Sequence, residues 1–65
     1  MIKVVSQSNV GKFTVLFLSD SLPLKKFYKI EINGKEYQPE IVYDMPKALA
    51  VNEKENFVGK TINFI

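Results

Sequence analysis

The chain contains no cysteine and no histidine. It therefore has no disulfide, no thiolate nucleophile, no imidazole general base and none of the soft ligands that zinc sites usually use. Arginine is also absent, since all nine basic residues are lysines. Because the planar guanidinium is the preferred group for clamping phosphate or reading bases, this absence argues mildly against such a surface. The sequence predicts a protein that is not an enzyme, with no catalytic residue, metal site or cofactor.

The length and composition predict one small folded domain that spans residues 1–65. Hydrophobic residues make up 46% of the chain and the formal net charge is only +2, a balance typical of globular proteins. A chain this short buries only about 60% of its unfolded surface, and its core rarely supplies more than roughly 3–5 kcal/mol. Tight packing or self-association must therefore support the fold, which keeps a homodimer open.

Alternating apolar residues predict strands along most of the chain. Over residues 12–18 they occupy both faces, so this strand should be buried on both sides. Residues 2–5 are typical of an opening strand, and residues 8–11 contain the serine, asparagine and glycine that favour a connecting turn. Residues 60–65 predict a closing strand, in which Ile62 and Phe64 alternate with polar residues.

A hairpin is the strongest local prediction. Residues 27–32 alternate cleanly, and Asn33-Gly34 then supplies the two positive-φ residues of a type I′ turn. A two-residue turn places Ile30 opposite Tyr37 and Glu31 opposite Glu36. A three-residue loop would place Ile30 against a charged residue. Because burying each large apolar side chain contributes about 1.5–3 kcal/mol, against roughly 0.2–1 kcal/mol for a cross-strand pair, we expect the two-residue turn.

The stretch after the hairpin is harder to assign. Pro39 cannot donate to a ladder, so it marks an edge, a bulge or the start of a strand at 40–43. Residues 47–51 fit either a short helical turn after Pro46 or a short strand. Five or six short strands together predict an all-β fold, either a small barrel or a strongly twisted antiparallel sheet, and leave open one short helical turn near 46–50.

The motifs that could carry chemistry are weak. Gly59-Lys60-Thr61 ends a phosphate-binding loop, but Lys54 stands where the first glycine is required and a strand pattern follows. Glu31 and Glu36 could form an acid and base pair, but a solvated hairpin face, on which Lys29 and Lys35 offset their repulsion, is the simpler interpretation. The other carboxylates that could join a hard-cation site lack the spacing of a calcium loop: Asp20, Glu40 and Asp44.

The stretch 25–37 mixes lysines with aromatic residues, as single-strand nucleic-acid binding surfaces do. The alternation puts Tyr28 and Tyr37 on the apolar side, which leaves Phe27 beside Lys29 on the outer face. Exposed aromatic and leucine side chains gain much when a contact buries them. We therefore predict that a partner-binding surface is formed by Leu22, Lys25, Lys26, Phe27 and Lys29.

The leading functional hypothesis is a non-enzymatic module that binds a protein partner through a sheet face or an edge strand. The alternative is a small barrel that binds RNA or single-stranded nucleic acid, whose affinity would fall steeply with salt. A lysine-only, asparagine-rich composition is also typical of AT-rich bacterial or phage genomes, where small inhibitor proteins occur. The longest apolar run, residues 15–18, is too short for a signal peptide or a membrane span, so we expect a soluble, cytoplasmic protein.

Two stretches, LKKFYKIEINGKEYQPEIVY and NFVGKTINFI, carry a family resemblance. Their layout resembles the β-barrel second domain of translational GTPases, in which a hairpin strand has the equivalent of residues 29–32 and a late glycine turn leads into a closing strand. In this chain Lys26-Phe27 replaces the family's Gly-Asp turn. The resemblance implies a stand-alone barrel, without a GTPase domain, that acts through contacts with RNA or protein. It transfers no functional residue.

Overall fold

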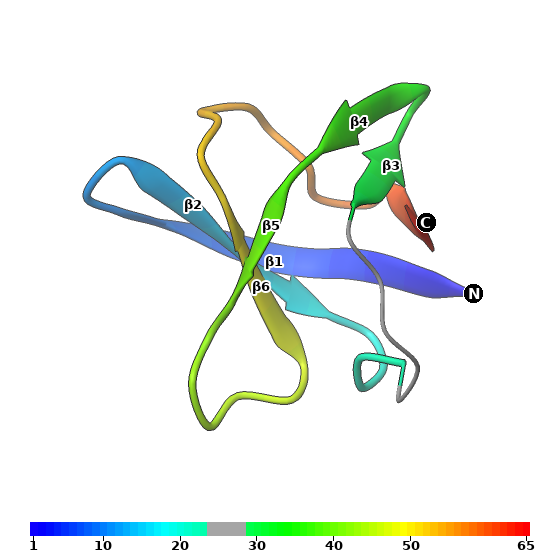
Figure 1. Cartoon of the computed structure of the whole chain (residues 1–65), viewed down its shortest axis with the longest axis horizontal. Coiled ribbons are helices and arrows are strands. Elements are labelled where there is room, and N and C mark those ends of the chain that lie inside the picture. Colours follow the sequence, from blue (N-terminus) through cyan, green and yellow to red (C-terminus); the bar gives the residue numbers. More distant parts are fainter. Residues whose placement is uncertain (24–28) are drawn as a thin grey trace.

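The computed structural model describes residues 1–23 and 29–65 (Figure 1). Within these ranges seven antiparallel strands form one sheet in the order β4-β3-β7-β1-β2-β6-β5. The strands are β1 (Ile2–Val10), β2 (Phe13–Leu18), β3 (Ile30–Ile32), β4 (Lys35–Tyr37), β5 (Pro39–Ile41), β6 (Ala48–Val51) and β7 (Thr61–Phe64). The all-β prediction is confirmed. In the same ranges, no helix has the length and apolar character needed to cross a membrane.

The expected count of five or six strands is wrong, and of the two alternatives left open near 46–50 the strand is observed rather than the helical turn. Ala48–Val51 forms β6, which pairs with β2 on one side and with β5 on the other. All four β6 residues are buried. Two neighbouring strands thus satisfy the backbone of this short apolar segment on both sides, which a single exposed helical turn could not do.

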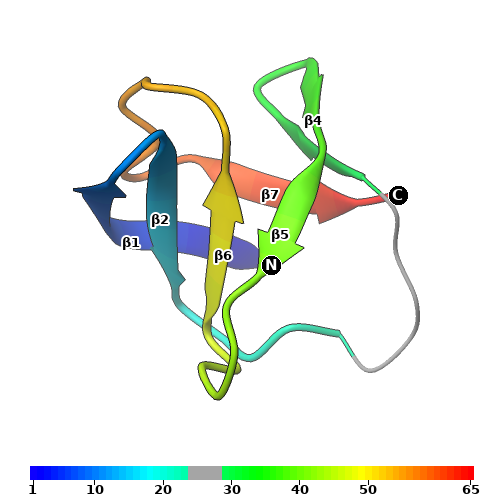
Figure 2. The same cartoon turned by 60° about the vertical axis from the view of Figure 1, so that its left-hand side comes forward.

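The two ends of the sheet order follow each other in the chain. β4 and β5 are separated by one residue, Gln38, and one continuous segment carries both outer strands. The sheet therefore curls around its apolar face, as the views in Figure 1 and Figure 2 show. In the described residues no pairing joins β4 to β5, so the sheet is open and the predicted closed barrel is not supported. Pro39 begins the outer strand β5, which confirms its assignment to an edge.

The core fills the inside of this curl. Its buried members come from six strands and from the segment that joins β6 to β7: Val4, Leu16, Leu18, Ile30, Ile32, Tyr37, Leu49, Val51, Phe57 and Ile62. β2 illustrates the alternation, because its even-numbered residues are fully buried and its odd-numbered residues are half-buried. The prediction that this strand is covered on both sides therefore holds fully for one face and partly for the other.

The first hairpin is longer than the sequence predicted. β1 runs to Val10, which pairs with Phe13, so the turn consists of Gly11 and Lys12 rather than residues 8–11. Gly11 has a φ of 60°, as the first central residue of a type II′ turn requires. The polar residues at 6–9 form cross-strand pairs with β2, and this pairing overrides their local preference for a turn.

The second hairpin is confirmed in detail. Asn33 and Gly34 have φ values of 56° and 86°, and Ile30 pairs with Tyr37 while Glu31 pairs with Glu36. A strand follows the late glycine, as predicted, and it begins at Thr61. Gly59 has a φ of 85° in a turn closed by the Lys60 amide, which donates to the Phe57 carbonyl, and β7 follows directly.

Candidate functional site

The segment 52–60, which joins β6 to β7, is fixed to the sheet by side chains. The Gln7 amide nitrogen donates to the Glu55 carbonyl at 2.7 Å, and the Phe57 amide donates to Gln7 Oε1 at 2.7 Å. The carboxamide of Gln7 thus offers one donor and one acceptor to the segment, as the backbone of a neighbouring strand would. The Gln7 side chain therefore fixes the backbone of the segment at two positions, Glu55 and Phe57.

Two further side chains hold the beginning of the segment. Thr14, which is fully buried, donates its hydroxyl to the Glu53 carbonyl at 2.5 Å. Lys54 reaches back to the first hairpin, where its ammonium donates to the carbonyls of Gly11 and Phe13 at 2.8 and 2.9 Å. The segment has few backbone ladder bonds of its own, so these side chains set its path.

A cluster around Tyr37 joins the second hairpin to this segment. The Tyr37 hydroxyl donates to Glu55 Oε2 at 2.6 Å, and the Lys35 ammonium lies 3.8 Å from the same oxygen and 3.2 Å from Glu53 Oε1. The Lys35 ammonium also sits 5.2 Å from the centre of the Tyr37 ring. The Tyr37 ring meets the Phe57 ring edge to face, with 5.3 Å between centroids, which is a favourable aromatic geometry.

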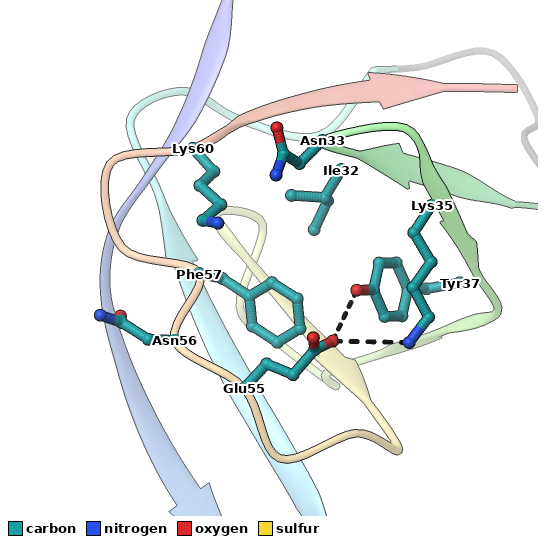
Figure 3. Close-up of a pocket in the computed structure, with 8 residues that line it drawn as sticks. All are labelled: Ile32, Asn33, Lys35, Tyr37, Glu55, Asn56, Phe57 and Lys60. Atoms are coloured by element: carbon teal, nitrogen blue, oxygen red, sulfur yellow. Dashed lines mark hydrogen bonds and ion pairs between the residues drawn. The ribbon is translucent and has the colours of Figure 1, made fainter.

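A pocket of about 170 Å³ opens between these two elements (Figure 3). The hairpin contributes Ile32, Asn33, Lys35 and Tyr37. The segment contributes Glu55, Asn56, Phe57 and Lys60. The floor is the end of the hydrophobic core, because Ile32 and Phe57 are buried, while the rim is charged and polar. Sequence reasoning missed this pocket, because it gave no role to Glu55, Asn56 or Phe57.

The environment of Tyr37 predicts a measurable ionisation. Burial, followed by the hydrogen bond and negative charge of Glu55, raises the pKa of Tyr37 to about 12. The unfolded chain has a tyrosine pKa of about 10, so Tyr37 contributes stability below about pH 10 that is lost as the pH rises from about 10 to about 12. A spectrophotometric titration should show one of the three tyrosines ionising near pH 12.

Two variants test whether Tyr37 is the tyrosine that ionises near pH 12, which appears as a late component of the titration. Tyr37→Phe should remove it, whereas Glu55→Gln should lower the pKa of Tyr37 only partway, because burial is the larger cause. If no tyrosine of the wild type ionises near pH 12, or if one still does in Tyr37→Phe, then burial and Glu55 do not raise the pKa of Tyr37.

The predicted partner-binding residues are only partly described. Lys25, Lys26 and Phe27 lie outside the described residues. Leu22 is half-buried and packs against the core, and Lys29 is exposed, with its ammonium 3.4 Å from Glu36 Oε1. The two described members thus lie in different environments, and their role in binding a partner stays a prediction.

The two glutamates considered as an acid and base pair each interact with another residue. Glu31 accepts a hydrogen bond from the Asn63 amide at 3.2 Å, and Glu36 pairs with Lys29. The two glutamates are side by side, as predicted, but neither lines the pocket. Across residues 1–23 and 29–65, no three His, Cys, Asp or Glu side chains come close enough together to hold a metal ion.

A second feature that sequence reasoning missed is an apolar surface at the outer strand β5. Ile41, Tyr43 and Met45 are 62%, 92% and 41% exposed, and we call these three residues the apolar edge. Figure 1 and Figure 2 show the β5–β6 turn, which carries two of them, at the opposite end of the molecule from the β3–β4 turn and the 52–60 segment. The available signal was three large apolar residues at every second position, beside a strand that Pro39 marks as an edge.

Comparison of the chain with protein-family models, with curated proteins and with solved structures finds no match. The resemblance to the second domain of translational GTPases therefore stays a prediction.

Proposed function

We propose that this protein is a non-enzymatic module that binds a protein partner through the apolar edge. One observation carries the proposal: Tyr43 is 92% exposed, between two other exposed apolar side chains on an outer strand and its turn. Exposed apolar residues that stand singly are common, but three of them within five residues of the chain form a group of the kind that interaction surfaces contain. Tyrosine and methionine are also enriched in the cores of protein interfaces.

The local backbone favours such a contact. The Met45 amide donates to the Val42 carbonyl and the Ala48 amide donates to the Met45 carbonyl, both at 3.2 Å, so two successive turns hold the apolar edge in place. Binding then orders little new structure, which preserves affinity. β5 is the last strand in the sheet order, and an outer strand can also accept a strand from a partner.

The charges beside the apolar edge favour a protein over a nucleic acid. Glu40 precedes Ile41, Asp44 lies between Tyr43 and Met45, and both carboxylates would repel phosphates. A strand-binding groove for nucleic acid needs cations that follow the backbone. Residues 39–47 contain two carboxylates and a single lysine, Lys47, so no row of cations accompanies the aromatic ring.

Affinity capture from the source cells tests the proposal. The bait is the purified chain, compared with the double variant Ile41→Ser and Tyr43→Ser. We expect wild type to retain a stoichiometric protein that the double variant loses by at least about tenfold, since the anchoring residues of an interface each contribute more than 1 kcal/mol. Because both side chains are exposed, thermal unfolding of the variant should stay close to that of wild type.

The matched control is Val58→Ser, which removes a comparably exposed apolar side chain from the 52–60 segment. It should leave capture unchanged. Equal retention of the partner by wild type and the double variant would contradict the assignment of the surface. Recovery of nuclease-sensitive, salt-sensitive RNA in place of a protein would contradict the proposed class of partner.

A further inference from the structure

The outer side of the sheet is polar over one half and apolar over the other. Over β3, β4 and β7 the strand register places Glu31, Glu36 and Asn63 side by side. Over β1, β2 and β6 the residues in consecutive cross-strand pairs on the outer side are apolar, and we call these six the outer apolar face: Val10, Phe13, Val15, Phe17, Ala48 and Ala50. Figure 2 shows β2 and β6 side by side, with β5 next to β6.

The centre of the outer apolar face comes from β2. Phe13, Val15 and Phe17 are half-buried, and in the described part of the chain none of the three packs against the core. Val10, which pairs with Phe13, is 57% exposed. Strands with apolar residues on both faces are typical of sheets that are covered on both sides. The outer apolar face therefore suits a second covering layer.

Two exposed residues of opposite charge border this face. The Lys12 ammonium lies 5.5 Å from the centre of the Phe13 ring, at one end of β2. Glu40 on β5 pairs with Ala50, which pairs with Val15, and directly paired residues share one side of a sheet. Among residues 1–23 and 29–65, neither Lys12 nor Glu40 forms an ion pair.

These two charges lie at about the same distance from Val15, in perpendicular directions. Lys12 is three residues away along the chain, about 10 Å in an extended strand, and Glu40 is two strands across the sheet, also about 10 Å. A two-fold axis that passes through Val15, in the plane of the contact, and bisects these directions places Lys12 of one copy over Glu40 of another. The strands of the two copies then cross at nearly a right angle, which is one of the two usual ways in which sheets pack.

The same symmetry places large side chains over small ones. Phe13 of one copy lies over Ala50 of the other, and Val10 lies over Ala48. Val15 meets its own counterpart on the axis. Large residues facing small ones let two sheet faces interdigitate, so the outer apolar face is complementary to itself in shape as well as in charge.

We propose that the outer apolar face binds the same face of a second copy of this chain, as a symmetric dimer with Val15 at its centre and two Lys12–Glu40 ion pairs at its border. Burial of this face adds the support that a core of 65 residues needs. The dimer does not depend on the apolar edge, because Ile41 pairs with the core residue Leu49 and lies on the opposite side of the sheet from Glu40.

Sedimentation equilibrium of the purified chain tests the proposal. We expect a monomer–dimer equilibrium in which Lys12→Glu and Glu40→Lys each weaken the dimer by at least about tenfold, because one reversal brings like charges together at both symmetric contacts. The variant that carries both reversals restores opposite charges and should recover the wild-type affinity to within about threefold. Both side chains are exposed, so all three variants should keep the fold.

The matched control is Lys3→Glu, which makes the same charge change on β1 beside β7, outside the outer apolar face, and should leave the dimer unchanged. A wild type that stays monomeric at about 1 mM would overturn the proposal, and so would a dimer that neither single reversal weakens. A dimer that is lost in the double variant Ile41→Ser and Tyr43→Ser would also overturn it, since the copies would then meet at the apolar edge.

Discussion

Phe57→Ala is expected to unfold the protein at 25 °C. The Phe57 side chain is 2% exposed and packs edge to face on Tyr37, so its truncation leaves a cavity at the end of the core. Removing a buried phenylalanine costs about 3–5 kcal/mol. A core of this size supplies roughly 3–5 kcal/mol in total, so little or no stability remains. Near-ultraviolet circular dichroism and chemical denaturation measure the loss.

Two further substitutions serve as comparisons for Phe57→Ala. Phe57→Leu keeps most of the buried volume and should leave a folded protein with a lower midpoint of unfolding. Tyr43→Ala removes another aromatic ring, but one that is 92% exposed, and should change the free energy of unfolding by less than about 0.5 kcal/mol. A Phe57→Ala protein as stable as Tyr43→Ala would show that the 52–60 segment is not packed into the core.

Gln7→Ala should lower the free energy of unfolding by about 1–3 kcal/mol, because it leaves two backbone groups of the 52–60 segment without their partner. The Phe57 amide loses its acceptor and the Glu55 carbonyl loses its donor. The loss is local as well as global, so hydrogen exchange at the Phe57 amide should accelerate more than exchange at Ile30, in the β3 strand.

Gln7→Glu separates the two bonds. The carboxylate still accepts from the Phe57 amide but can no longer donate to the Glu55 carbonyl. We expect slow exchange at the Phe57 amide to be retained and the total destabilisation to be smaller than in Gln7→Ala. If both variants are as stable as wild type, the Gln7 carboxamide does not fix the segment.

Local signals in the sequence predicted the parts of the fold that are decided locally. Asn33-Gly34 can adopt positive φ at both turn positions, so the second hairpin and its register followed from two residues and the apolar pattern beside them. The closing strand followed from the alternation of Ile62 and Phe64. Pro39 located an edge because it lacks an amide proton.

Features that depend on distant pairing were missed. Residues 8–11 resemble a turn, but pairing with β2 extends β1 to Val10. The strand β6 was left undecided, since its partners in the two neighbouring strands are 31 to 37 and 8 to 12 residues away along the chain. Phe57 and Val58 are the only apolar residues between Val51 and Ile62, so periodicity gave no sign that Phe57 is buried.

The two missed surfaces share a cause. The pocket exists because Gln7, Thr14 and Lys54 bring the 52–60 segment against the sheet, and none of these contacts joins residues close in sequence. The apolar edge exists because β5 is the last strand in the sheet order, with β6 as its one neighbouring strand among residues 1–23 and 29–65. Both surfaces depend on which strands and segments become neighbours in the fold, and local sequence preferences do not determine that.

The central claim is that the chain acts by contact through the apolar edge while the rest of the fold stays unchanged. Hydrogen–deuterium exchange of the chain, free and in complex with the protein captured by wild type, tests it most directly. We predict slower exchange at the backbone amides of residues 40–45 and unchanged exchange in the 52–60 segment. Protection confined to other strands, with residues 40–45 exchanging as fast as in the free chain, would contradict the account.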